Sequence, residues 1–478
     1  MMWKRWMWWI SCVFCLSLVS VACTEPVPNN ETVSEPTGND HNGNEKTGSD
    51  AGPKETIAEP TPDKPVYKPA YTFKGELVAC QKNESFEKLK IILEGGKNNP
   101  TGRGEQGSAY DPCNGRMIVF GGNDYQPKQC ANFGPKRFKG DTWMYVHKYK
   151  NWIKLKTDNA PSARGRQAMT FDRSRKKIYL FGGRYRPEAS SGAYILYNDF
   201  WEFDVNTDKW KKIETTGAVP TPRSNSYMIY DYVNDSVILF GGNSSTSGLN
   251  FKPLNDTYRL NLKTMKWWRF DASVRPKARL FHSLMLDSKR NRVILYGGGG
   301  VNAFTGPFFN DVWAFDLKKE AWSQIWSPGF GKVGPAARIE TTMIEDIPRN
   351  RMLMFAGHDD TSVGHRNDVW SFDLDKHTWK QVHAGDTGTG QGCTSFCRCS
   401  PDFVQVDKNS PERREYHAFE HMLGTDTVLL FGGKTDCGYI DDTWSYDLKA
   451  NKWTKINDAS QGEACKRTGR ANCKELCY

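Results

Sequence analysis

The sequence predicts an all-β protein, a six-bladed β-propeller with four antiparallel strands in each blade. Two observations predict this fold. An apolar run ending in Gly-Gly recurs six times, and each copy continues with an Asp-x-Trp-like step and then a lone Trp. The copies begin their glycine pairs at Gly121, Gly182, Gly241, Gly297, the variant Ala356 and Gly432. A unit of this length cannot bury its apolar face alone, so it must stack on copies of itself.

Each copy contains four short apolar segments between turn signals. The first follows a Pro-x-x-Arg sequence and alternates, as in residues 167–171, and the second ends on Gly-Gly, as in residues 178–183. The third opens with Asp and an aromatic residue, and the fourth opens near a Trp such as Trp210. Short β-branched and aromatic runs without a helical period indicate strands. Four strands in each of six copies is the pattern of a β-propeller.

The order of these motifs resembles the kelch repeat over residues of about 86–457. The first copy is degenerate but keeps Pro100, Arg103 and Trp152. Residues 86–92 match an additional fourth strand, which would close the ring or belong to an incomplete seventh blade. The resemblance implies a six-bladed kelch propeller over residues 71–457, in which the first strand of each blade is innermost.

The first 23 residues are typical of an export signal. Lys4 and Arg5 precede an apolar stretch that ends at Cys23, and this order is that of a secretory leader. The segment before Cys23 resembles the lipobox of bacterial lipoproteins, which implies a lipidated Cys23 and a bacterial cell envelope, with the outer membrane as the destination. An uncleaved membrane anchor is the alternative.

Residues 24–70 are rich in Pro, Asn, Glu, Thr, Gly and Ser and contain no Phe or Trp, so they predict a disordered linker. Ten cysteines remain beyond the leader and Cys23. An even number in an exported chain predicts disulfides, and their pairing stays open. Several fall in an insertion at residues 384–410 and in a Cys-rich tail at residues 458–478. Cys393, Cys397 and Cys399 have no matching His/Cys set at zinc spacing, so we expect no metal and no cofactor.

A ring of arginines is the strongest functional pattern. Each copy carries Pro-x-x-Arg, and these residues are Arg103, Arg164, Arg223, Arg279, Arg338 and Arg414. Their common position predicts that they lie on one face, and the innermost first strand that the resemblance implies puts them around the mouth of the propeller. Guanidinium forks there would attract carboxylate, phosphate or sulfate. The alternative is that each Arg pairs with an Asp of its own or a neighbouring blade, such as Asp199, Asp256 or Asp311. Three residues further on, Gln106, Gln167, Ser226, His282, Thr341 and His417 make a second polar layer plausible.

The loops after the Gly-Gly pairs differ in length and sequence and include aromatic and polar residues such as Arg184, Tyr185, His358 and His365. Variable loops on a rigid scaffold are a usual binding surface. The string from His417 to His421 spells H-x-x-E-H, but on a strand its two histidines are about 13 Å apart, too far apart for one metal. The formal charge of +10 is spread without a dense basic block, which argues against nucleic acid.

These observations favour an exported, lipid-anchored kelch propeller that acts as a monomeric binding or scaffold module. The expected ligand is a protein or a glycan, with acidic ligands among them, held by the arginine-lined face together with His282, His417, Arg184 and Tyr185. The resemblance implies an acidic ligand, because other members of the kelch family bind acidic peptides on such a face. The alternative is a carbohydrate-active enzyme similar to N-acetylneuraminate epimerase, with His282 or His417 as acid or base.

Overall fold

The computed structural model describes residues 99–124, 127–129, 132–133, 137–187, 192–359, 364–388, 404–435 and 438–459. Six antiparallel sheets follow one another along the chain, and each has the predicted four strands as its main body. Blade 1 consists of β1 (Gly107–Asp111), β2 (Arg116–Phe120), β5 (Thr142–Val146) and β6 (Asn151–Leu155). Blade 2 consists of β7 (Ala168–Asp172), β8 (Lys177–Phe181), β11 (Phe200–Asp204) and β12 (Lys209–Ile213). Blade 3 consists of β14 (Tyr227–Asp231), β15 (Ser236–Asn243), β16 (Pro253–Asn261) and β17 (Lys266–Phe270).

The second half of the ring repeats the same plan. Blade 4 consists of β18 (Ser283–Asp287), β19 (Arg292–Tyr296), β20 (Val312–Asp316) and β21 (Ala321–Trp326). Blade 5 consists of β23 (Thr342–Asp346), β24 (Arg351–Asp359), β25 (His365–Asp373) and β26 (Thr378–His383). Blade 6 consists of β29 (Ala418–His421), β30 (Thr427–Phe431), β33 (Thr443–Asp447) and β34 (Lys452–Asn457).

Shorter elements decorate the blades. Strand β13 (Thr216–Gly217) pairs with β17 in parallel, and β22 (Arg338–Ile339) pairs with β24. Four small hairpins are β3 (Pro127–Gln129) with β4 (Asn132–Phe133), β9 (Arg184–Tyr185) with β10 (Ile195–Leu196), β27 (Thr387–Gly388) with β28 (Val404–Gln405), and β31 (Lys434–Thr435) with β32 (Gly438–Tyr439). Single 3-10 turns lie at η1 (His147–Tyr149), η2 (Ser288–Arg290) and η3 (Ile347–Arg349).

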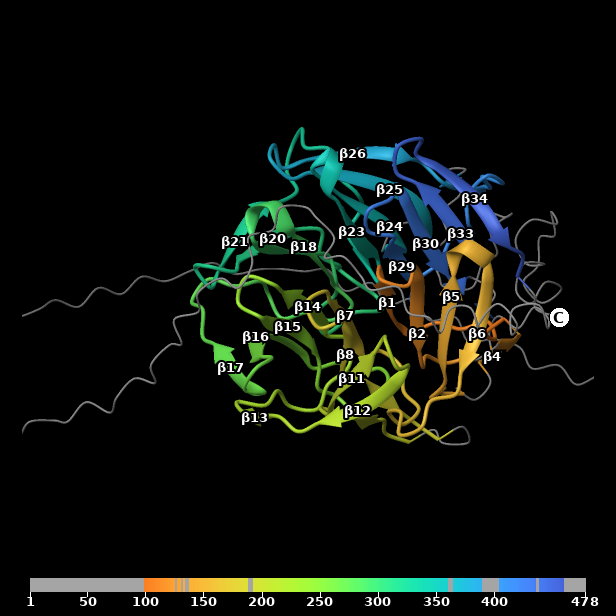
Figure 1. Cartoon of the computed structure of the whole chain (residues 1–478). Coiled ribbons are helices and arrows are strands. Elements are labelled where there is room, and N and C mark those ends of the chain that lie inside the picture. Colours follow the sequence, from red (N-terminus) through yellow and green to blue (C-terminus); the bar gives the residue numbers. More distant parts are fainter. Residues whose placement is uncertain are drawn as a thin grey trace, which may run out of the picture. The chain divides into compact units, whose positions relative to one another are not determined.

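The six first strands surround the axis, with the fourth strands outside (Figure 1). Strand β1 packs against β7 on one side and β29 on the other, so blade 6 meets blade 1 and the ring is closed. The second glycine of every pair donates its N–H to the carbonyl of the motif arginine in the next blade. For example, Gly242 donates to Arg279 at 3.0 Å, and Gly433 of blade 6 donates to Arg103 of blade 1 at 2.7 Å. The six-bladed prediction is confirmed.

The Gly-Gly pairs are required by the close approach of neighbouring blades. Both glycines have positive φ, for example 69° at Gly297 and 97° at Gly298, a region that side chains disfavour. A Cβ on Gly297 would lie 2.7 Å from the backbone oxygen of Arg338 in the next blade. In the fifth copy Ala356 adopts the same conformation, with φ of 60°.

The outer tryptophans fill the wedges between blades, as predicted. Each packs on the aromatic residue directly before the Gly-Gly or Ala-Gly pair of the preceding blade: Trp152 on Phe431, Trp210 on Phe120, Trp267 on Phe181, Trp322 on Phe240, Trp379 on Tyr296 and Trp453 on Phe355. Their ring centroids are 4.3–5.5 Å apart. Three indoles also donate to a buried Thr of the preceding blade, as Trp322 does to Thr257 at 2.9 Å. These contacts bury large flat surfaces where the blades diverge.

Several expectations lie outside the described residues: the leader with Cys23, the linker, residues 86–92, most of the 384–410 insertion and all but two residues of the tail. Of the ten cysteines, only Cys113 is described. No helix in the described ranges is long and apolar enough to cross a membrane.

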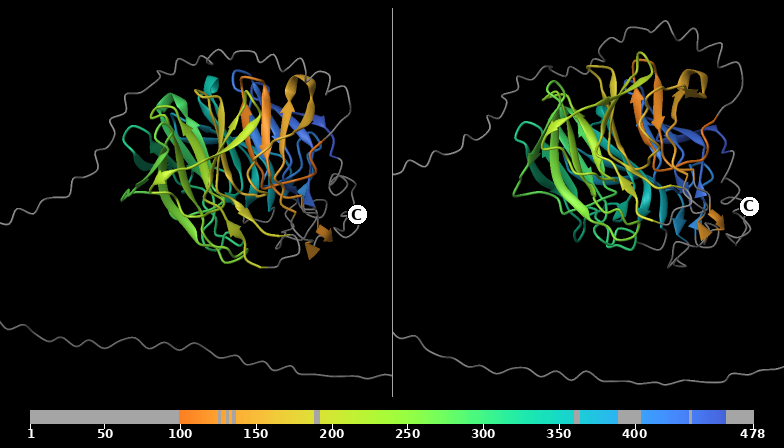
Figure 2. Two further views of the ribbon diagram at one scale, coloured as in Figure 1. Left: turned by 60° about the horizontal axis from the view of Figure 1, so that its bottom comes forward. Right: turned by 90° about the horizontal axis from the view of Figure 1, so that it is seen from below.

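Figure 2 shows the sheets from the side, with strands running between two faces of the ring. One face carries the loops after the Gly-Gly pairs and the entries to the first strands, and we name it the loop face. Its small orange strands β3 and β4 are visible at the lower edge of both views. The opposite face carries the short turns within each blade.

Candidate functional site

The six motif arginines form fork-to-fork ion pairs inside their own blades. In each, Nη1 and Nη2 donate to the two carboxylate oxygens of an aspartate that lies just before or within the third strand, at 2.5–3.3 Å. The pairs are Arg103–Asp141, Arg164–Asp199, Arg223–Asp256, Arg279–Asp311, Arg338–Asp368 and Arg414–Asp442. At most 1% of any of these arginine side chains is exposed. The pairing alternative of the sequence analysis is therefore what the structure contains.

Each arginine also joins three strands of its blade. Nη1 of Arg279 donates to the carbonyl of Gly297 at 2.9 Å, and its Nε donates to the carbonyl of Lys277 at 3.0 Å. The same two bonds recur in all six copies. Burial alone would raise the pKa of Asp311, but the bonds from Arg279 hold that pKa below its usual value. A planar guanidinium suits this junction because it offers five donors in fixed directions.

Two glutamines of the second polar layer join neighbouring blades. The amide of Gln167 donates to the carbonyl of Phe120 at 2.9 Å, and Gln106 donates to that of Phe431 at 3.4 Å. Both contacts cross from one blade to the preceding one. Thr341 instead donates to the carbonyl of Phe355 in its own blade, at 3.0 Å. These three side chains therefore have a structural role, as the arginines do.

The two candidate acid–base histidines lie in apolar surroundings. The ring of His282 is fully buried between Tyr227 and Phe240, and burial, then Arg279, lowers its pKa to about 3. Burial, then Arg414, also places the pKa of His417 well below its usual value, and its Nε2 lies 2.7 Å from Oγ1 of Thr342. Histidines that stay neutral down to acid pH are poor proton donors at neutral pH. The enzyme alternative gains no support from them.

A different set of residues faces the axis, two positions after each arginine. We name it the axial ring: Glu105, Arg166, Asn225, Phe281, Glu340 and Tyr416. All six have left-handed backbones with φ of 56–62°. The N–H of Arg166 donates to the carbonyl of Glu105, and that of Asn225 to the carbonyl of Arg166, so this backbone links successive blades. All six also line a central cavity of about 300 Å³.

The axial ring holds a buried charge cluster. Nη2 of Arg166 donates to Oε1 of Glu105 at 2.8 Å and to the hydroxyl of Tyr416 at 2.6 Å, while its guanidinium lies 4.9 Å from the centre of the Phe281 ring. Arg184, from the loop after the Gly-Gly pair of blade 2, also donates to Glu105, at 3.0 Å. Thus Arg184, a predicted site residue, is buried and paired.

Opposite charges in the axial ring are not balanced one to one. Burial raises the pKa of Glu340 well above its usual value, although Arg166 acts against this. Burial therefore favours the protonated form of Glu340. Nε and Nη1 of Arg166 and Oε1 of Glu340 are buried and make no hydrogen bond among the described residues. Such unsatisfied groups are costly and call for a partner molecule or a water.

Aromatic side chains from the loops cover the axial ring at the loop face. Phe251, Phe304 and Phe308 pack with Phe281 and Tyr416, and Phe281 and Phe304 are stacked at 5.7 Å. The axial ring residues are all buried, with at most 8% exposed. The loop face therefore has an apolar cap where the sequence predicted an arginine-lined mouth.

The other end of the cavity carries acids. Burial raises the pKa of Glu420 to about 7, and Oγ of Ser108 donates to its Oε1 at 2.6 Å. Burial also raises the pKa of Glu345 to about 7, although Ser288 donates to it. Glu420 belongs to the H-x-x-E-H match of residues 417–421, which lies on strand β29 and the residue before it, as predicted.

The outer loop face carries isolated exposed apolar side chains. Ile195, Leu249 and Val301 are 51%, 76% and 62% exposed. Tyr185 is half-buried and its ring packs 5.8 Å from Phe138. Ile195, Leu249 and Val301 come from three different Gly-Gly loops, so the loop face combines segments distant in sequence.

Sequence reasoning missed the axial ring. Its members vary between copies, whereas the search favoured positions that repeat. The usable signal was a position that changes from Glu to Arg, Asn, Phe, Glu and Tyr inside an otherwise constant motif. It also missed that His358 and His365 meet Glu415, the residues that could hold a metal.

Comparison with known proteins agrees with this architecture. The KLHDC2/KLHL20/DRC7 Kelch-repeats domain matches residues 82–274, 232–402 and 335–475. The chain belongs to the kelch-repeat family. This kelch protein is 26% identical over 306 residues to Kelch domain-containing protein 2 of Bos taurus. The aligned region covers 59% of this chain and 66% of the bovine protein.

Two further relatives carry another kelch name. Kelch domain-containing protein 10 of Xenopus tropicalis is 24% identical over 303 residues, covering 61% of this chain and 68% of that protein. The Rattus norvegicus protein of that name is 25% identical over 281 residues, covering 57% and 63%. The kelch chain thus spans about two thirds of the length of these relatives. A kelch propeller is consistent with a protein-binding scaffold.

Proposed function

We propose that this kelch protein is an exported, lipid-anchored module that binds an acidic partner protein on its loop face. The observation that carries the proposal is the contrast between the recurring residues and the loops of the repeat. The arginines that recur in each copy are buried and paired inside the propeller. The loops after Gly-Gly vary and expose Ile195, Leu249 and Val301. Variable loops held by a rigid frame are where recognition usually lies.

The charge of the partner follows from the charge of the chain. The formal net charge is +10, and half-buried Arg186 and exposed Lys252 belong to two of the loops. An acidic surface on the partner would steer association, and added salt would weaken it. A glycan is the other ligand class that the aromatic loops suit, and it is an outcome of the test below.

Photo-cross-linking from single positions of the full chain tests the binding face. A photoreactive residue at Leu249 or Val301 should link the chain to one protein, which is then purified and titrated. Matched positions Lys318 and Lys449 are exposed on turns of the opposite face and should not link to it. Equal cross-linking from both faces, or binding of acidic glycans alone, would overturn the proposed protein partner.

Export and anchoring have their own test. The leader and Cys23 form a lipobox-like end, so we expect the full chain to incorporate labelled palmitate and to sediment with membranes. The Cys23→Ala variant should lose the label and leave the membrane fraction. An unlabelled wild-type chain would contradict the lipid anchor and leave the binding proposal unaffected.

A further inference from the structure

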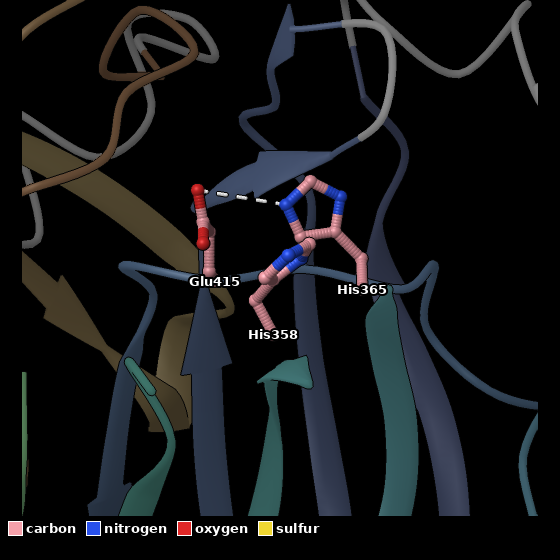
Figure 3. A group of neighbouring side chains, drawn as sticks. All are labelled: His358, His365 and Glu415. Carbon is pink, nitrogen blue, oxygen red and sulfur yellow. Dashed lines mark ion pairs between the residues drawn. The ribbon is translucent and has the colours of Figure 1, made fainter. Parts of the chain in front are cut away.

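Three ligand-type side chains meet where blades 5 and 6 touch. His358 lies near the end of β24, and His365 begins β25. The two are direct cross-strand partners, which places both imidazoles on the same side of this hairpin. Glu415 comes from blade 6, just before the axial ring residue Tyr416. Figure 3 shows the three side chains pointing toward one another.

Their spacing is close to that of a metal centre. One ligand atom from each residue lies within 4.8 Å of the others, and Nε2 of His365 is 3.5 Å from Oε1 of Glu415. Donors bound to one tetrahedral zinc ion at 2.0–2.1 Å are about 3.3 Å apart. The His365–Glu415 distance of 3.5 Å is close to that spacing, and the longest separation has to shorten by at most about 1.5 Å. Side-chain rotation can supply such a movement.

The site is enclosed. The exposed fractions are 8% for His358, 5% for His365 and 4% for Glu415. The Phe308 ring lies 6.2 Å from that of His358 on one side. Gly364 leaves the room that His358 occupies, because a Cβ there would lie 3.3 Å from its Cε1. A buried set of two imidazoles and a carboxylate is a donor set that zinc and related ions prefer.

Lys434 is the natural competitor of a cation. Its Nζ lies 2.7 Å from Oε1 of Glu415, and 24% of its side chain is exposed. Its ammonium therefore has room to swing into solvent. An ion that binds Glu415 would displace it, so the lysine sets the affinity of the site by competition.

We propose that His358, His365 and Glu415 bind one divalent transition-metal ion of the zinc class. The ion fastens the loop end of the blade 5 hairpin to blade 6. Three protein donors leave a fourth position open for water or for an anionic group of a ligand. This metal site does not depend on the proposed protein partner or on export.

Zinc titration of the chelator-stripped full chain tests the site. We expect one zinc ion per chain whose binding depends on His365, together with a higher melting temperature, because a ligand specific for the folded state stabilises it. His365→Ala should weaken this binding by more than about 10–100-fold, the loss seen when only residues around a metal site are changed. His147→Ala, at a half-buried histidine in blade 1, is the matched control and should bind as wild type does.

Two further variants make the outcome unambiguous. Lys434→Met should bind zinc more tightly than wild type, an effect that a merely structural loss of packing would not produce. Glu415→Gln should weaken binding while its circular dichroism spectrum stays that of wild type. Any zinc held by cysteines would also bind to His365→Ala, so the difference between the two titrations reports the histidine site alone. Equal titrations of wild type, His365→Ala and Glu415→Gln would overturn the proposal and leave the cluster an ion-pair network.

Discussion

Two rings of residues run around the propeller, two positions apart in each blade, and they behave in opposite ways. The motif arginines are identical in all six copies. Each donates its hydrogen bonds to an aspartate and two carbonyls of its own blade, as Arg223 does. The axial ring differs in every blade except for its two glutamates, and three of its buried polar atoms make no hydrogen bond among the described residues.

The difference shows what repetition within one chain reports. A residue that recurs in every blade meets a need that every blade has, here the joining of three strands. A position that keeps its backbone conformation while its side chain changes, as the axial ring does at φ of 56–62°, is free of that need. Such a position is available to a ligand or to a local charge arrangement.

The largest effect should come from breaking one arginine fork. Arg414→Met leaves Asp442 charged, with both side chains of the native pair fully buried, so we expect a loss of about 3–5 kcal/mol in the free energy of unfolding. Urea denaturation measures it. Arg166→Met in the axial ring should lose less, about 1–2 kcal/mol, because Glu105 keeps Arg184.

The double variant Arg414→Met with Asp442→Leu controls this comparison. It should regain part of the lost stability, because no unpaired carboxylate remains. An Arg166→Met loss as large as that of Arg414→Met would remove the contrast between the two rings.

The next effect concerns the acid end of the cavity. The pKa of Glu420 is raised to about 7 in the folded protein, against about 4.3 in an unfolded chain. As the pH rises through this interval, the unfolded state loses its proton first, so wild-type stability falls between about pH 4.3 and 7 and then levels off. Glu420→Gln should therefore gain about 1–3 kcal/mol over wild type at pH 8 and nothing near pH 4.

Urea denaturation at pH 4, 6 and 8 measures this dependence. Glu214→Gln, at a carboxylate that is 85% exposed, is the control and should follow the wild-type curve. A wild-type stability that rises from pH 5 to pH 7 relative to Glu420→Gln would contradict the raised pKa.

A smaller effect on stability should distinguish the glycine pairs from the Ala356-Gly357 variant of the fifth copy. Gly297→Ala has to place a Cβ 2.7 Å from the carbonyl oxygen of Arg338 at a φ of 69°, and we expect a loss of about 1–3 kcal/mol. Ala356→Gly relieves the left-handed alanine but removes a buried methyl, so the net change should stay within about 1 kcal/mol. Thermal denaturation of both variants decides this, and equal losses would show that the close approach is not what requires glycine.

The smallest effect on stability should come from the loop face. Leu249→Ser changes a side chain that is 76% exposed, so unfolding should stay within about 0.5 kcal/mol of wild type. Binding of the partner found by cross-linking should weaken all the same. Surface plasmon resonance against that partner checks it, with Lys318→Ser on the opposite face as the control that keeps full affinity.

The sequence predicted the repeated parts of the fold well and the shared parts of the site poorly. Gly-Gly, the wedge tryptophans and the four-strand plan are local signals that appear six times. In contrast, whether Arg223 is free or paired depends on where Asp256 of the third strand lies, and both alternatives fitted the sequence. The apolar cap was not predicted, because Phe251 and Phe304 come from different loops and meet only above the axial ring.

By itself, the sequence determined the all-β class, the six blades and the left-handed glycines, because these follow from short-range patterns and from the need of each unit to cover its apolar face. Only the tertiary structure decided which polar groups are satisfied and which are left over. That decision depends on contacts between blades, such as Glu415 with His358 and His365, and on the loss of water around each charge. The contacts between blades and the loss of water around the charges both arise when the ring closes, so neither can be predicted from one repeat.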